Sequence, residues 1–70
     1  MYTGYVQNID NTLRTKYNGT KSFHKWDKYL TNVLRNAQHA NRINDLSTMH
    51  LMTLYDIGVG MLNSAKKEVK

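Results

Sequence analysis

Seven basic or polar residues recur along the middle of this chain at alternating spacings of four and three. An α-helix has 3.6 residues per turn, so these spacings place all seven on one face, which we call the basic stripe. A row of apolar residues falls almost opposite, and no acid interrupts the stripe. The pattern predicts an amphipathic helix over residues 22–41, with a core on one side and a cationic surface on the other. The basic stripe consists of Lys21, Lys25, Lys28, Asn32, Arg35, His39 and Arg42.

The rest of the sequence also favours helices. The 70 residues include no proline and only four glycines, which suits long helices better than short strands joined by frequent turns. Apolar residues at helical spacing predict two further helices, over residues 3–17 and 45–66. We therefore expect an all-α protomer of three helices in a single domain.

Turn and cap residues mark the expected boundary between the first two helices. Asn18 and Gly19 accept the left-handed conformation that commonly closes a helix, so the first helix should end beside them. Thr20 or Ser22 would then cap the second helix by accepting an orphan backbone N–H.

The third predicted helix, which Asn44 or Asp45 would cap, is apolar around well over half of its circumference. Two neighbouring helices cannot cover so wide an arc, so we expect a symmetric homo-oligomer that buries the remainder. Gly60 and Ser64 are small residues four positions apart, so both lie on one side of the helix and would let another helix approach closely. The expected interface residues are Met52, Tyr55, Val59, Gly60 and Ser64. The alternative interpretation is that Gly58-Val59-Gly60 breaks or kinks this helix.

The chain is strongly basic. A net charge of +5 and a pI near 9.7 favour contact with nucleic acid, an anionic membrane or an acidic protein. No apolar run is long enough to span a bilayer, and the amino-terminal residues lack the basic-then-apolar layout of a signal peptide. We therefore expect a cytoplasmic protein without a membrane span.

Residues that would carry catalysis or bind a metal are sparse. There is no cysteine, and the three histidines lack the spacing of a zinc site. His50 falls among apolar residues, which favours a core or interface histidine, and only loosely placed residues such as Ser47 and Asp56 would complete a triad with it. Gly58-Val59-Gly60 lacks the third glycine of a dinucleotide-binding loop. We predict no enzyme activity, catalytic residue, metal or cofactor.

The leading functional hypothesis is a small, non-catalytic regulatory protein that binds nucleic acid or another polyanion, mainly at phosphate groups, through the basic stripe. A second hypothesis is an inhibitor or adaptor, of the kind that phages and mobile elements encode, that docks on an acidic protein surface through the stripe or through the third helix. A third is an oligomer in which the stripes of adjacent protomers bind a small anionic nucleotide. Salt-dependent binding, a protein partner that survives nuclease, and ligand-dependent melting would distinguish the three.

Overall fold

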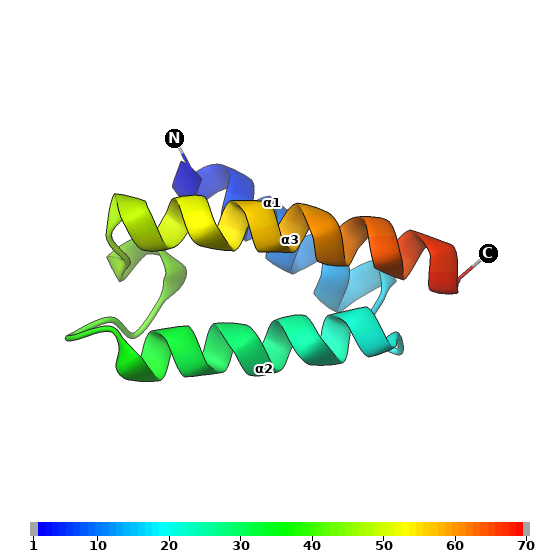
Figure 1. Ribbon diagram of the computed structural model, residues 1–70, viewed down its shortest axis with the longest axis horizontal. Helices are drawn as coiled ribbons and strands as arrows, with labels where there is room; N and C mark the ends of the chain where they lie inside the picture. The colour runs from blue at the N-terminus through cyan, green and yellow to red at the C-terminus, as the bar shows by residue number, and fades with distance from the viewer. Residues whose placement is uncertain (1, 70) are drawn as a thin grey trace.

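The computed structural model describes residues 2–69 as three α-helices and one short 3-10 helix. The elements are α1 (Tyr2–Lys16), α2 (Lys21–Asn36), η1 (Ile43–Asp45) and α3 (Thr48–Glu68). No strand occurs within the described residues, so the predicted all-α class and the three helices are confirmed. α1 and α3 run in the same direction and α2 runs in the opposite one (Figure 1).

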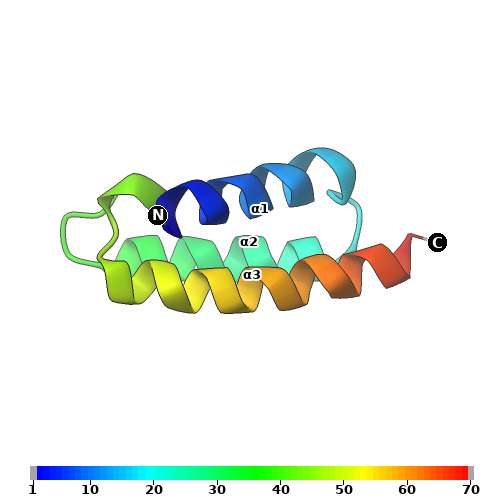
Figure 2. The same ribbon diagram turned by 90° about the horizontal axis from the view of Figure 1, so that it is seen from above.

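The three helices form a triangle in cross-section. α3 packs against both α1 and α2. Figure 1 shows α2 below both α1 and α3, and the view from above in Figure 2 shows α2 between and behind them, so α1 and α3 both lie on the same side of α2. Within residues 2–69, the opposite side of α2 therefore has no neighbouring helix.

The core lies where the three helices meet. Trp26 of α2, Val6 and Leu13 of α1 and Leu54 of α3 are its largest fully buried side chains. The indole of Trp26 keeps its polar atom satisfied, because Nε1 donates a hydrogen bond of 2.9 Å to the Asp10 carboxylate. The apolar row predicted opposite the basic stripe thus supplies two buried core residues, Trp26 and Leu30.

The boundary between α1 and α2 is a tight turn at residues 17–20. Thr20 caps α2 as predicted, since its Oγ1 accepts a hydrogen bond of 3.1 Å from the Phe23 amide. The left-handed conformation expected at Asn18 and Gly19 is absent, because His39 is the one residue with positive φ among those described. The turn closes instead through the Thr20 amide and hydroxyl, which both donate to the Tyr17 carbonyl.

α2 ends at Asn36, well before residue 41, and this corrects the predicted boundary. Ala37 is extended, and His39 has a φ of 64°, so the chain leaves the helix axis there. The departure turns Ala40 and Ile43 into the core at the end of the bundle, where both are buried. A continued helix would have kept these apolar groups from reaching α1 and α3, so tertiary burial overrides the local helical pattern.

α3 begins at Thr48, and its cap is Ser47 rather than Asn44 or Asp45. The Ser47 hydroxyl accepts a 3.4 Å hydrogen bond from the His50 amide and lies 2.9 Å from Nδ1 of the same residue. His50 is exposed, so the expectation that it lies in the core is wrong, and the alternative of an interface histidine stays a prediction. It completes the first turn of the helix instead.

α3 is one continuous helix through Gly58-Val59-Gly60, so these residues do not break it. Gly58 is buried at the contact with α1 and α2, where a Cβ would lie 2.8 Å from Ile9 Cγ2. Around Gly60 a Cβ would meet nothing within 4 Å. Close helix approach inside the protomer therefore explains Gly58, whereas no neighbour within the protomer explains Gly60.

Candidate nucleic-acid interface

The open side of α2 carries five residues of the basic stripe, which we call the α2 basic face. All five side chains belong to exposed residues, while Trp26 and Leu30 on the opposite side of the helix are buried. Burial of Trp26 and Leu30 fixes the rotation of α2 about its own axis, and in that rotation the cations on the other side face solvent. The α2 basic face consists of Lys21, Lys25, Lys28, Asn32 and Arg35.

His39 and Arg42 do not belong to this face, which corrects their predicted helical placement. Both residues are exposed, but they lie in the segment between α2 and α3 rather than on a helix. Arg42 lines a separate hollow of about 380 Å³ together with Gln7 and Asp10 of α1. The early end of α2 therefore shortens the surface that the sequence pattern predicted.

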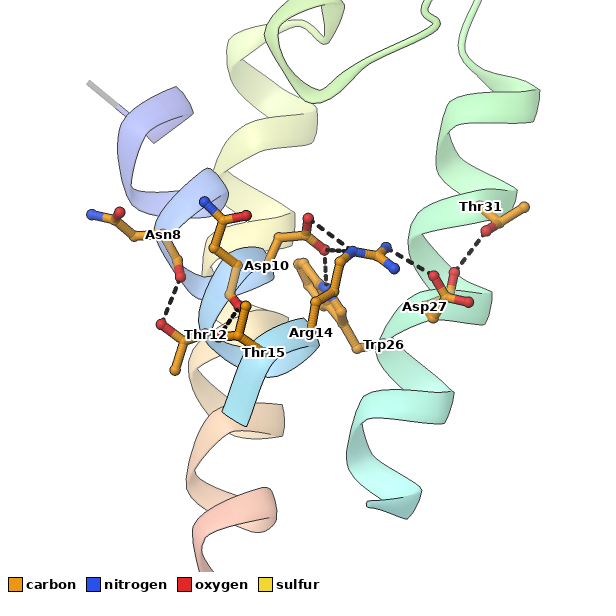
Figure 3. A network of polar contacts seen from close by, with 9 residues as sticks. Asn8, Asp10, Thr12, Arg14, Thr15, Trp26, Asp27 and Thr31 are labelled. Atoms are coloured by element: carbon orange, nitrogen blue, oxygen red, sulfur yellow. Dashed lines mark hydrogen bonds and ion pairs between the residues drawn. The ribbon is translucent and has the colours of Figure 1, made fainter. Parts of the chain in front are cut away.

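Asp27, the acidic residue of α2, forms its ion pair with Arg14 of α1 and not with a cation of the α2 basic face. Arg14 of α1 binds Asp10 through Nε at 3.0 Å and Asp27 of α2 through Nη2 at 2.8 Å (Figure 3). Its guanidinium also lies over the Phe23 ring, 5.4 Å from the centroid. Among residues 2–69 both ion pairs belong to Arg14, so no carboxylate forms an ion pair with a cation of the α2 basic face.

This network also fixes the charge state of Arg14. Partial burial opposes the charged form, but the hydrogen bonds that the guanidinium donates to the Asp10 and Asp27 carboxylates outweigh it and raise the pKa of Arg14 above its ordinary value. The i,i+4 spacing of Asp10 and Arg14 is a signal that sequence reasoning overlooked. The ion pair between Arg14 and Asp27 joins two different helices, and no spacing in the sequence predicts it.

A second carboxylate lies at the amino end of the α2 basic face. Glu68, from the last turn of α3, accepts hydrogen bonds from the Lys21 amide at 2.8 Å, the Ser22 amide at 3.0 Å and the Ser22 hydroxyl. The hydrogen bond from the Ser22 hydroxyl, followed by that from the Lys21 amide, lowers the pKa of Glu68. Together with the Thr20 cap, this contact satisfies the first orphan amides of α2.

Two concave regions border the α2 basic face. A shallow hollow of about 520 Å³ follows α2 itself, and its lining residues are His24, Asp27, Lys28, Thr31, Asn32 and Arg35. An open groove of about 710 Å³ separates the first half of α2 from the second half of α3. Its lining residues are Lys21, Ser22, Lys25, Ile57, Gly60, Met61, Ser64 and Glu68.

The five residues expected at an oligomer interface fall on two different sides of α3. Gly60 and Ser64 line the groove beside α2. Met52, Tyr55 and Val59 lie at helical spacing on another face, where the Tyr55 ring is 5.7 Å from those of both Tyr2 and Tyr5. Met52 and Val59 are 46% and 36% exposed. We call the set Tyr2, Tyr5, Met52, Tyr55 and Val59 the tyrosine patch.

The part of the chain that the structure describes contains no group of three or more His, Asp or Glu side chains placed to hold a metal ion. None of its helices combines the length and the apolar character needed to cross a bilayer. Ser47 and His50 are in contact, but they act as the cap of α3.

Comparison with known proteins gives no match to a protein-family model, to a curated protein or to a solved structure.

Proposed function

We propose that this protein is a small, non-catalytic binding protein that contacts the phosphate backbone of nucleic acid through the α2 basic face. The observation that carries the proposal is a row of four exposed cations on one helix, none of which forms an ion pair with a carboxylate of the described residues. The four cations are Lys21, Lys25, Lys28 and Arg35.

Counterion release supplies the driving force. Each Lys or Arg that neutralises a phosphate releases part of the condensed cation atmosphere, so affinity falls steeply with salt. The amide of Asn32, in the same row, donates to phosphate oxygens or base edges without adding charge. Because Arg14 holds Asp27 at one flank, that carboxylate repels an approaching phosphate less than a free one would.

Fluorescence anisotropy with labelled 20-base-pair DNA tests the proposal. The double reversal K28E/R35E changes two of the four cations of the α2 basic face and should abolish most of the binding at low salt. The matched control is K66E/K67E, which changes the net charge equally at two exposed positions near the end of α3. An equal loss of DNA affinity in both variants would show that binding depends only on net charge. Unaltered binding by K28E/R35E would refute the assignment of the α2 basic face as the binding surface.

We further propose that the protein self-associates through the tyrosine patch. Its support is the cluster of Tyr2, Tyr5 and Tyr55 rings, in which Tyr5 is 57% exposed, beside the exposed Met52. Aromatic residues such as tyrosine, and methionine, are enriched at protein interfaces relative to the rest of the protein surface. Multi-angle light scattering should give a multiple of the 8.2 kDa chain mass, and Y5S/M52S should give the monomer mass. A monomer mass for the unmodified chain at high concentration would end this proposal.

A further inference from the structure

We propose that the partner of the α2 basic face is double-stranded DNA, with α2 lying in the major groove. This inference rests on the proposed function and narrows it from nucleic acid in general to one helical form. It is carried by the orientation of the aromatic residues of α2, the isolation of that helix on one side of the molecule, and the distribution of its polar groups.

The α2 basic face offers no aromatic platform for single-stranded bases. Trp26 is fully buried, and Phe23 is half-buried beneath the guanidinium of Arg14. Tyr29 is half-buried against the core. Proteins that hold single strands combine a positive groove with aromatic side chains on which successive bases stack. The exposed aromatics, Tyr2 and Tyr5, gather around Tyr55 instead of along α2.

The placement of α2 suits entry into a groove. α1 and α3 both lie above it in Figure 1, so its other side faces no described helix, and we call that side the ridge. From Lys21 to Arg35 the row extends about 21 Å at 1.5 Å per residue, which matches about six base pairs. The major groove of B-form DNA is about 12 Å wide and admits an α-helix. The deep, narrow major groove of A-form RNA does not.

The polar groups on the ridge are distributed as a groove-bound helix requires. At about 100° per residue, Lys25 lies on one side of the ridge and Lys28 and Arg35 lie about 60° to 80° away on the other. These cations therefore face the phosphates of the two opposite strands. Asn32 occupies the middle of the ridge, and an Asn side chain there pairs with N6 and N7 of adenine.

Binding of three matched probes tests the inference: a 20-base-pair DNA duplex, its separate single strands, and the RNA duplex of the same sequence. We expect the DNA duplex to bind at least about tenfold more tightly than either alternative, since one well-formed base contact is worth that factor. Equal or stronger binding to single strands or to RNA would overturn the inference while leaving the proposed function intact. Absence of binding to all three probes would refute the proposed function itself, and the inference with it.

Chemical footprinting gives a second readout on the complex. Dimethyl sulfate methylates guanine N7 in the major groove and adenine N3 in the minor groove. Protection of N7 by the unmodified protein, lost in K28E/R35E, supports the inference. Protection of N3 alone would contradict it. The substitution N32A should weaken duplex binding about tenfold, whereas the control N63A, at an exposed position of α3, should leave it unchanged.

Discussion

Gly58 of α3 lies against the six-membered ring of Trp26, so that a Cβ at this glycine would be 3.2 Å from Cζ3 of the indole. The same Cβ would be 2.8 Å from Ile9 Cγ2, which is closer than real Cβ atoms approach. The substitution G58A should therefore force α3 away from the other two helices and lower the free energy of unfolding by about 1–3 kcal/mol. Urea denaturation followed by the fluorescence of the single tryptophan measures this loss.

The matched control for that prediction is G60A, two residues further along the same helix. Apart from its own stretch of helix, no atom of the described residues lies within 4 Å of the site of its Cβ, so the substitution meets no clash. Replacing a helical glycine by alanine should raise the free energy of unfolding by about 0.5–1 kcal/mol. Similar responses of the two variants would show that the contact with Trp26 does not set the packing distance.

Asp10 joins the core to the polar network, because it accepts from Trp26 Nε1 at 2.9 Å and from Arg14 Nε at 3.0 Å. The substitution D10A should lower the free energy of unfolding by about 2–3 kcal/mol, since it leaves a buried indole N–H without an acceptor. D10N keeps an acceptor oxygen but loses the charge, so its free energy of unfolding should lie between those of D10A and the unmodified chain. Thermal unfolding of the three proteins tests this order, which a D10A midpoint equal to the unmodified one would contradict.

The contact of Glu68 with Lys21 and Ser22 predicts a dependence of stability on pH. The pKa of Glu68 in the folded chain is lower than the ordinary value of 4.5, because its carboxylate accepts hydrogen bonds from the Ser22 hydroxyl and the Lys21 amide. Stabilisation by Glu68 is therefore complete above the unfolded pKa and is lost as the pH falls through the lower folded value.

The difference in stability between the unmodified chain and E68Q isolates this effect. We expect a constant difference at neutral pH that shrinks as the solution is acidified below about pH 4.5, because Glu68 is then protonated and becomes uncharged, as the glutamine is at every pH. D56N, which removes an exposed carboxylate from the same helix, serves as the control. A difference for E68Q that does not vary between pH 7 and pH 3 would contradict the assigned contact.

His39 has a φ of 64°, in the region that favours glycine. For a residue that has a Cβ, this conformation costs about 1 kcal/mol of conformational free energy. The substitution H39G should therefore raise the free energy of unfolding by up to about 1 kcal/mol, whereas Q38G, at a residue without positive φ, should lower it. Denaturant unfolding of both variants decides the point, and a loss of stability in H39G would show that the imidazole makes a stabilising contact.

Much of the fold follows from apolar periodicity. The spacing of Val6, Ile9 and Leu13 predicts the buried side of α1, and that of Trp26 and Leu30 predicts the buried side of α2. The cap at Thr20 follows from its residue type immediately before a helical pattern. These features depend on neighbours a few residues apart, which the sequence displays directly.

Apart from the overlooked i,i+4 pair of Asp10 and Arg14, the features that were missed depend on residues far apart in the chain. The local pattern of the basic stripe continues to Arg42, but the requirement to bury Ala40 and Ile43 ends α2 at Asn36. The contact of Glu68 with the Lys21 amide spans 47 residues, and no local spacing announces it. The residues predicted as one interface on α3 lie on two different sides of the helix. The positions of α1 and α2 against α3 decide which of its residues stay exposed, and no local spacing specifies these positions.

The central claim is that four cations of α2 bind phosphate, and the salt dependence of DNA binding tests it most directly. If all four neutralise phosphates, the slope of log K against log salt should be about −3 to −4, at about −0.9 per contact. K28E/R35E should reduce the magnitude of that slope by about 2, and K66E/K67E should leave it unchanged. A slope near zero in the unmodified protein, or an identical slope in K28E/R35E, would contradict the account.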